Sequence, residues 1–419
     1  MRIFVVLLFL AISATGSAQT ITVASSPSDV DLDPQRLHRI DNLIQDYVSQ
    51  SKIPGAVALV VRNGKIAYLQ AYGVRDVNSK QKLQTDDIFR IASQTKAITA
   101  LAVMMLFEEG KFMLDEPVSH FIPEFADATV LTSFNAADTT YTTTKANRPI
   151  TIRDLLTHTS GIDYPAIGSP EFQAIYAKAG IPSGIGNDRY KLGDKIRALA
   201  KLPLKHQPGE RFTYGLNSDV LGYLVEVLSG MSLDEFFRTR IFEPLGMKNT
   251  YFYVPREKRS RVVAVHEISN NKLVRVDHPV YDGADPDYPK SDGTYYSGGA
   301  GLSSTVEDYA RFLQLFLNKG LYNGKRLLSR KTVELMLTLQ THDPIANQVG
   351  LGFGLETENN DYRSIVSKGT FSWGGAFSST YWADPQEQII GLLFTNMYNT
   401  PYGDIHEKFK NLVYQAVGD

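Results

Sequence analysis

Hydrophobic positions near the start of the chain predict a helix followed by two antiparallel strands. Asp33-Pro34 suits the N-cap and first turn of a helix, and apolar residues then recur at helical spacing over residues 37–48. Two apolar runs follow, at residues 56–61 and 66–72, on either side of Asn63-Gly64. Because Asn-Gly readily adopts the positive φ angles of a tight turn, these runs predict a β-hairpin.

The other end of the chain carries the same kinds of element. Residues 380–383 and 389–395 predict a second hairpin across Asp384-Pro385-Gln386, and residues 405–416 carry an apolar stripe at helical spacing. Each apolar face needs a cover, so we expect the two ends to build one antiparallel sheet flanked by an N-terminal and a C-terminal helix. The predicted α/β sheet domain comprises residues 19–85 and 295–419.

The middle of the chain, residues 86–294, is expected to form an inserted, mainly helical domain. Residues 126–148 and 278–297 are rich in Thr, Asp, Pro, Gly and Tyr and are expected to be long ordered loops of the kind that shape a cleft. Helical periodicity in and just beyond this middle part predicts helices at residues 97–109, 152–156, 218–228, 233–241, 306–317 and 331–339. The expected fold is therefore α/β plus all-α.

Composition excludes several classes of function. The 419 residues are 43% hydrophobic and 21% charged, as in ordinary globular proteins, and the formal net charge of -2 gives no reason to expect a nucleic acid partner. The absence of cysteine excludes disulfides, thiolate metal sites and a cysteine nucleophile. Neither Gly-x-Ser-x-Gly nor His-Glu-x-x-His occurs, which argues against an α/β-hydrolase and a zinc enzyme. We expect neither a metal nor a cofactor.

Residues 1–18 have the layout of a secretory signal peptide. Arg2 precedes an apolar run over residues 3–12, and small residues close the segment at Ala18. The run is short for a membrane-spanning helix, which needs roughly 20 apolar residues, so an uncleaved anchor is the less favoured alternative. We expect export to the periplasm or the medium and a mature form without a stable membrane span.

Ser93 and Lys96 are the strongest candidates for nucleophilic chemistry. They precede residues 97–107, which are apolar almost all the way round and predict a buried helix with both side chains on one face. Because burial disfavours an ammonium group, we expect a neutral Lys96 that accepts the serine proton. The alternative is an N-cap serine with a snorkelling lysine. The same spacing recurs, without an apolar helix, at Ser49-Lys52, Ser79-Lys82 and Ser269-Lys272.

Several short sequence motifs follow one another along the chain and include the Ser93–Lys96 segment. They are Phe89-Arg90-Ile91-Ala92-Ser93-Gln94-Thr95-Lys96, Leu155-Leu156-Thr157-His158-Thr159-Ser160-Gly161, Pro208-Gly209-Glu210-Arg211-Phe212-Thr213-Tyr214, Gly298-Gly299-Ala300-Gly301-Leu302-Ser303-Ser304 and Trp373-Gly374-Gly375. Together they resemble the serine β-lactamase and penicillin-binding-protein superfamily, in particular its class C β-lactamase-like branch and the family VIII carboxylesterases. The resemblance spans about residues 35–415 and implies a β-lactamase/transpeptidase-like fold.

The resemblance also implies roles for individual residues. Ser93 matches the acylated nucleophile, Lys96 its lysine partner, and Tyr214 the tyrosine that acts with the lysine in proton transfer. The backbone N–H groups of Ser93 and Ala376 would form the oxyanion hole. His158 is expected to be structural rather than a general base.

Two departures from the family pattern bear on the substrate. Asn217 falls three positions after Tyr214 instead of two, so its contact with a substrate amide is in doubt. The third motif, Lys-Thr-Gly in many β-lactamases, aligns with residues 373–375 and lacks the lysine that would bind a substrate carboxylate; Lys368-Gly369-Thr370, nearby but in the wrong order, is expected to be a loop. The residues expected to line the substrate site are Gln94, Asn217, Trp373, Gly374 and Gly375.

The chain is therefore predicted to be a serine hydrolase that works through an acyl-enzyme on small-molecule carboxylic esters or small amides. A β-lactamase or D-amino-acid peptidase is the alternative within the enzyme class. An inactive relative that binds peptidoglycan fragments or a partner is the alternative from another class, although such a module has no need for Ser93, Lys96 and Tyr214 together.

Overall fold

The two ends of the chain pair to form one eight-stranded sheet. The computed structural model describes residues 20–186, 189–281, 283–342 and 345–418, so the predicted signal peptide lies outside the described residues. The strand order is β1-β3-β2-β16-β15-β14-β13, with β4 paired to β3. The bounds are β1 Thr22–Val23, β2 Gly55–Arg62, β3 Lys65–Asp76, β4 Gln81–Lys82, β13 Gly354–Leu355, β14 Phe371–Gly375, β15 Ser379–Asp384 and β16 Ile389–Phe394.

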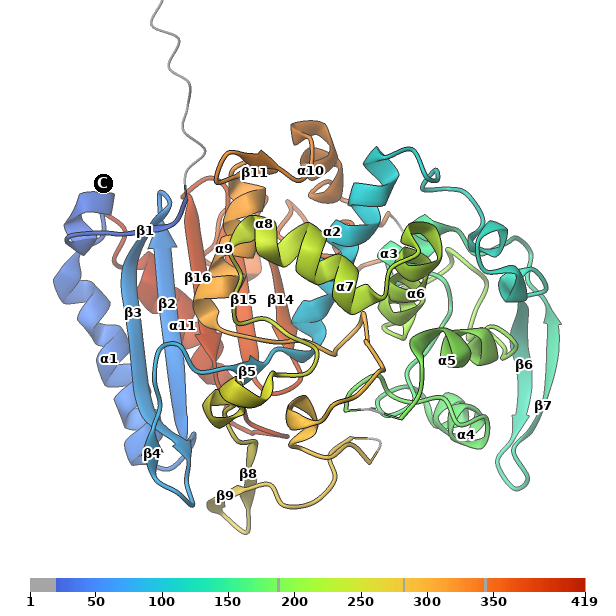
Figure 1. The fold of residues 1–419 in the computed structure, drawn as a ribbon, viewed down its shortest axis with the longest axis horizontal. Coiled ribbons are helices and arrows are strands. Elements are labelled where there is room, and N and C mark those ends of the chain that lie inside the picture. Colours follow the sequence, from blue (N-terminus) through green and yellow to red (C-terminus); the bar gives the residue numbers. More distant parts are fainter. Residues whose placement is uncertain (1–19, 187–188, 282, 343–344, 419) are drawn as a thin grey trace, which may run out of the picture.

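The central pairing joins the two predicted hairpins. Strand β2 runs antiparallel to β16, with Leu59 opposite Leu392 (Figure 1). The β2–β3 turn has positive φ angles at Asn63 and Gly64, as the Asn-Gly pair predicted. The predicted antiparallel sheet and its mixed fold class are therefore confirmed. The limits of the two predicted domains stay a prediction.

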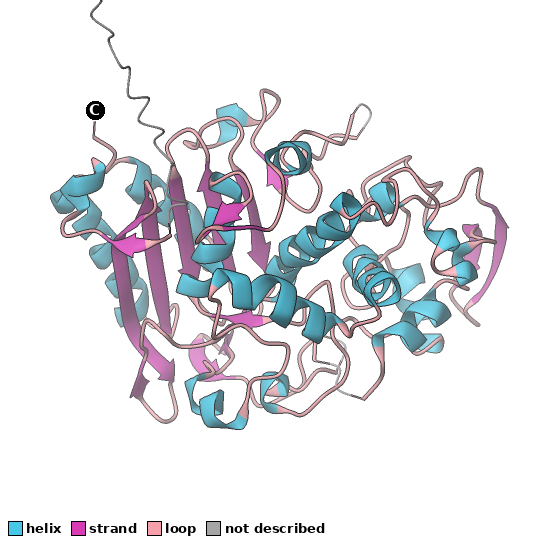
Figure 2. Ribbon diagram, turned by 45° about the horizontal axis from the view of Figure 1, so that its top comes forward, coloured by secondary structure: helices cyan, strands magenta, loops and turns pink. Residues whose placement is uncertain are grey.

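Helices cover both faces of the sheet (Figure 2). Helix α1 (Pro34–Ser49) packs beside α11 (Asp404–Tyr414) on one face, and α9 (Val306–Leu317) contacts the other. Successive residues of β2 point to opposite faces, so Val60 joins the core under α1 and α11 while Leu59 joins the larger core. Burial on both faces explains why this strand is an unbroken apolar run.

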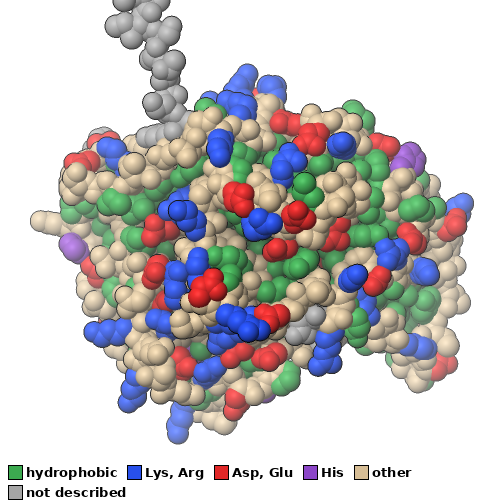
Figure 3. All heavy atoms as spheres, viewed as in Figure 1, with side chains coloured by type: hydrophobic (Ala, Val, Ile, Leu, Met, Phe, Trp, Pro, Cys, Tyr) green, Lys and Arg blue, Asp and Glu red, His purple; other side chains and the backbone are tan. Residues whose placement is uncertain are grey.

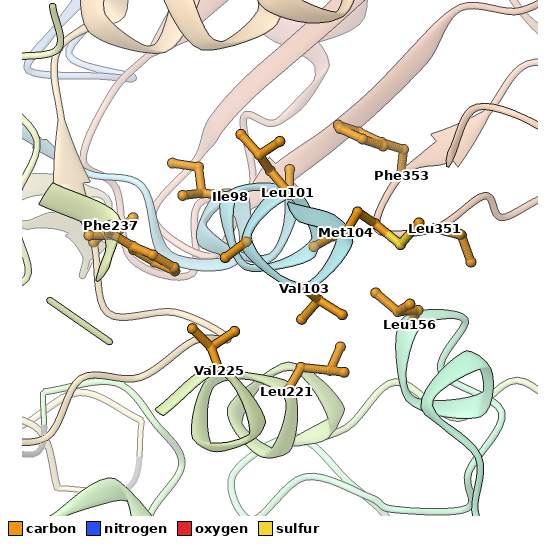
Figure 4. Packing of buried hydrophobic residues seen from close by; sticks show 14 of the residues in the cluster. Ile98, Leu101, Val103, Met104, Leu156, Leu221, Val225, Phe237, Leu351 and Phe353 are labelled. Carbon is orange, nitrogen blue, oxygen red and sulfur yellow. The ribbon is translucent and has the colours of Figure 1, made fainter. Parts of the chain in front are cut away.

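Helix α2 (Thr95–Glu108) is the centre of the larger core. Residues 95–106 are all buried, which confirms the helix predicted from an all-round apolar sequence. Figure 4 shows Val103 directed toward Leu221 and Val225 of α6, and Met104 toward Leu351 and Phe353. The other helices are α3 Ile152–Leu156, α4 Pro170–Lys178, α5 Leu192–Leu199, α6 Asn217–Ser229, α7 Leu233–Phe237, α8 Glu243–Leu245 and α10 Arg330–Met336, with a π-helical turn at Arg238–Phe242.

Part of the middle region departs from the prediction. The expected loop at residues 126–148 contains a hairpin of β6 (Thr129–Asn135) and β7 (Thr140–Lys145). Every residue of β7 is exposed, so no apolar alternation marks it in the sequence. The periodicity also failed to predict α4, α5 and three short two-stranded sheets. These are β5 (Phe89–Arg90) with β10 (Ser303–Ser304), β8 (His266–Ser269) with β9 (Lys272–Arg275), and β11 (Leu321–Tyr322) with β12 (Lys325–Arg326).

Charges of both signs lie side by side on the surface. On the face drawn in Figure 3, Lys and Arg side chains are interspersed with Asp and Glu rather than gathered into a patch of one sign. No helix among the described residues is long and apolar enough to span a membrane.

Candidate active site

Ser93 lies in a strained turn at the start of α2. A short 3-10 helix, Ala92–Gln94, connects β5 to α2 and places Ser93 at the junction. Ala92 has a φ of 41°, which is unusual for a residue with a side chain. A strained backbone conformation persists only where the surrounding structure enforces it, and such positions cluster at functional sites.

The side chains of Ser93, Lys96 and Tyr214 meet at one point. Lys96 Nζ donates hydrogen bonds to Ser93 Oγ at 3.2 Å, to the Tyr164 hydroxyl at 3.1 Å and to the Gly299 carbonyl oxygen at 2.7 Å. The Tyr214 hydroxyl donates to Ser93 Oγ at 2.6 Å. Lys96 is only 3% exposed, and Ser93 is half-buried. The structure therefore brings the three predicted residues together in a largely buried site.

Lys96 is not the neutral amine that burial alone predicts. Burial lowers the pKa of Lys96, but the phenols of Tyr164 and Tyr214 raise it more, and the net pKa lies above the ordinary lysine value. Three acceptors around Nζ also match the three N–H groups of an ammonium ion. The expectation of a neutral Lys96 is wrong for the resting site, because it rested on burial alone and the two phenols outweigh burial.

Tyr164 is a member of the cluster that sequence reasoning missed. Its side chain is buried, its ring centroid lies 5.4 Å from that of Tyr214, and burial raises the pKa of its phenol. The available signal was its position three residues after the Thr-Ser-Gly phrase that ends at Gly161. Because the chain has 22 tyrosines, this position alone does not single out Tyr164 as a site residue.

His158 packs against Tyr214, and Asn217 lies within hydrogen-bond distance of His158. Asn217 Nδ2 lies 3.1 Å from His158 Nδ1, and burial together with Lys96 lowers the pKa of His158 to about 3. A neutral His158 then packs against the rings of Tyr214 and Trp373, at centroid distances of 5.1 and 6.3 Å. Asn217 is 0% exposed, so it is not placed for the expected substrate contact and instead orients His158.

The remaining predicted site residues divide between the interior and the surface. Gln94 is fully buried and donates through Nε2 to Ser379 Oγ at 3.0 Å, so it holds the turn rather than facing substrate. Trp373 is half-buried at 5.9 Å from Tyr214, and Gly374 is exposed.

Gly375 allows β14 to approach the Ser93 turn closely. A methyl group at Gly375 would lie 2.5 Å from the carbonyl oxygen of Ile91, so only glycine fits there. This contact brings Ala376 beside the turn that carries Ser93. The Tyr281 hydroxyl donates to the Ala376 carbonyl oxygen at 2.9 Å and anchors this segment.

The comparisons with known proteins agree with this geometry. The profile of the Beta-lactamase family matches residues 40–415. The chain belongs to the Beta-lactamase family.

Named relatives of this family member include esterases. The chain is 30% identical over 412 residues to esterase EstB of Burkholderia gladioli, covering 94% of this chain and all of EstB. It is 34% identical over 362 residues to protein Rv1367c of Mycobacterium tuberculosis (strain ATCC 25618 / H37Rv), covering 83% and 86% of the two chains. The solved structure of EstCE1, described as a hydrolase with promiscuous acyltransferase activity, is similar at a TM-score of 0.79 and 26% identity, over 91% of this chain and 99% of EstCE1.

The third family motif of this protein, residues 373–375, carries no basic side chain. Lys368 lies in an exposed turn and forms ion pairs with Glu358 and Asp361, at 3.6 and 3.4 Å. A groove of about 380 Å³ borders the Ala376 segment and is lined by Gly374, Gly375, Ala376, Ser378, Ser379, Thr380, Met397, Asn399, Thr400 and His406.

The described residues contain no His, Asp and Glu cluster that could hold a metal ion.

Proposed function

We propose that this serine hydrolase cleaves small carboxylic esters through an acyl-enzyme formed on Ser93. The observation that carries the proposal is the convergence of Lys96 Nζ and the Tyr214 hydroxyl on Ser93 Oγ, at 3.2 and 2.6 Å. A serine hydroxyl is a poor nucleophile until a neighbour accepts its proton, and this arrangement supplies a proton path.

Tyr214 is the group best placed to move the proton of Ser93. Its oxygen is closer to Ser93 Oγ than the lysine nitrogen is, and the Lys96 ammonium lies 4.6 Å from the centre of its ring. In its phenolate form, which that ammonium stabilises, Tyr214 accepts the proton of Ser93 Oγ as Oγ attacks the ester carbonyl carbon. The phenol so formed gives this proton to the alcohol oxygen as the ester C–O bond breaks.

The oxyanion of the tetrahedral intermediate is assigned to the amides of Ser93 and Ala376. The close approach at Gly375 and the hydrogen bond from Tyr281 support this placement, because both restrain the segment that carries the second amide. Water then attacks the acyl group by the same proton path in reverse. No cofactor takes part.

Esters are favoured over β-lactams as substrates. A β-lactam carries a carboxylate, and the third motif at residues 373–375 offers no basic side chain to bind it. The names of the relatives point the same way, since EstB is an esterase and a protein of Penicillium rubens (strain ATCC 28089 / DSM 1075 / NRRL 1951 / Wisconsin 54-1255), 30% identical over 387 residues, is a lovastatin esterase.

A fluorophosphonate probe and two substrates test the proposal. The probe should label Ser93, and Ser93→Ala should abolish labelling and hydrolysis. Ser79→Ala, in an exposed serine with the same Ser-x-x-Lys spacing, should change neither. Short-chain p-nitrophenyl esters should turn over faster than nitrocefin. A folded but unlabelled wild type would favour a binding module, and the reverse substrate ranking would favour a β-lactamase.

We also propose that the protein is exported, on the strength of residues 1–18. Mass spectrometry of the protein from its native host should give an N-terminus at Gln19. An intact N-terminal segment on protein recovered from the membrane would indicate an anchor instead.

A further inference from the structure

A carboxyl group is buried beside the proposed catalytic cluster. Asp219, in the first turn of α6, is 0% exposed, and neither carboxylate oxygen accepts a hydrogen bond of good geometry from the described residues. Burial raises the pKa of Asp219 to about 6, although the Ser297 hydroxyl and the Gly299 amide lie near enough to oppose this in part. A buried carboxylate without firm partners is costly and needs a compensating interaction.

The Asp219 carboxylate lies next to Gly299, the residue that also contacts Lys96 and lies near the Tyr164 hydroxyl. The Gly299 carbonyl accepts the 2.7 Å hydrogen bond from Lys96. A methyl group added to Gly299 would lie 2.5 Å from Asp219 Oδ2 and 3.4 Å from the Tyr164 hydroxyl oxygen. A methyl group at Gly184 would lie 3.4 Å from both carboxylate oxygens. Two glycines thus leave room for a carboxylate against the cluster.

Three titratable groups interact with Asp219: the Lys96 ammonium of α2 and the buried phenols of Tyr164 and Tyr295. Burial raises the pKa of Asp219 and the Lys96 ammonium opposes this, whereas burial raises the pKa values of both phenols and Asp219 raises them further. A negative charge here opposes ionisation of the phenols. Because such interactions are reciprocal, it also favours the ammonium form of Lys96, whose pKa the phenols of Tyr164 and Tyr214 raise most.

We propose that Asp219 is a positioning residue, the buried anion that balances the Lys96 ammonium and sets the pH at which the Ser93 cluster gives up a proton. Asp219 acts through Lys96 and Tyr164 and does not touch substrate. The proposal rests on the proposed function for its effect on catalysis, but its effect on Lys96 can be measured in an inactive protein.

Asp219→Asn tests the charge while keeping the shape of the side chain. Without the anion the cluster should lose its proton more readily, so the acid limb of kcat/KM for a p-nitrophenyl ester should move to lower pH by about one unit or more. KM should change little. The Lys96 side-chain NMR resonance, assigned by its loss in Lys96→Met, should no longer show in Asp219→Asn the step that follows protonation of Asp219 near pH 6. If the acid limb stays in place, or the step persists in Asp219→Asn, the proposal is wrong.

Two further variants separate charge from structure. Asp219→Glu keeps the charge and should keep the wild-type acid limb even if the rate falls. Asp308→Asn removes a carboxylate that is equally buried but paired with Arg311 at 2.7 Å, so it should lower stability without moving the limb. A shift in Asp308→Asn equal to that in Asp219→Asn would assign the effect to general loosening and overturn the proposal.

The wild type provides a test that needs no variant to fold. As Asp219 takes up a proton near pH 6, the Lys96 resonance should show a step at the same pH. Absence of that step overturns the proposal. If the step appears but the wild type neither reacts with the fluorophosphonate nor cleaves esters, the proposed function fails while the role of Asp219 stands.

Discussion

Replacing Gly375 by alanine should disable the proposed oxyanion hole while leaving the protein folded. The added Cβ would lie 2.5 Å from the Ile91 carbonyl oxygen and 2.4 Å from Ser379 Oγ, whereas ordinary contacts begin at 3.4 Å. The segment must therefore move by about 1 Å, and a misplacement of that size can cost about 100-fold in rate. That factor corresponds to about 2.7 kcal/mol of transition-state stabilisation.

The assay compares this variant with its neighbour. A methyl group at Gly374 would meet the nearest atom, the Ser379 carbonyl oxygen, at 3.5 Å, so Gly374→Ala should retain kcat/KM within a few-fold. Both variants are measured on a short-chain p-nitrophenyl ester, with thermal unfolding as the check on folding. If Gly375→Ala is as active as Gly374→Ala, the close approach at Ile91 does not position a catalytic amide, and the assignment of Ala376 is wrong.

The other predictions concern the proton path, the anchor of Ala376 and acid stability. Tyr214→Phe should lower kcat by about 100-fold or more, because a general acid–base group is lost; near-normal turnover would remove the phenol from the mechanism. Tyr281→Phe removes one hydrogen bond to Ala376, typically about 1 kcal/mol, and should lower kcat a few-fold at constant KM; an unchanged kcat would mean that the anchor is dispensable. Burial lowers the pKa of His158 to about 3 and the pKa values of His266 and His406 to about 4, from an ordinary value of 6.5. The unfolded chain therefore binds protons that the folded chain does not, and the free energy of unfolding should fall as pH drops from 6.5 toward 4; urea titrations that give a constant value over that range would contradict this.

Much of the fold follows from local pattern. An all-round apolar run predicted α2 to within two residues of its start, and the Asn63-Gly64 turn fixed the first hairpin. Pairing of the two chain ends followed from the need to cover apolar faces. Where the pattern was silent, as in β7, the reason is exposure: a strand with no buried face leaves no hydrophobic period to detect.

The site was predictable in its nucleophile but not in its electrostatics. Recognisable sequence motifs mark Ser93, Lys96 and Tyr214. No motif marks Tyr164 or Asp219, which belong to the site only because the fold places them beside it. Tyr164 is 68 positions from Lys96 in the chain and yet accepts its hydrogen bond. Because a pKa depends on neighbours in space, burial alone gave the wrong charge for Lys96.

The pairing of β2 with β16 places a constraint on biogenesis. These adjacent strands lie in the middle of the sheet, although one is made early in translation and the other among the last residues. A ribosome-bound chain can pair β2 with β3, but the other edge of β2 lacks its β16 partner until synthesis is nearly complete, so the nascent protein has to be kept from aggregating meanwhile. A nonsense mutation ahead of Ile389 would accordingly delete the middle of the sheet rather than trim its edge.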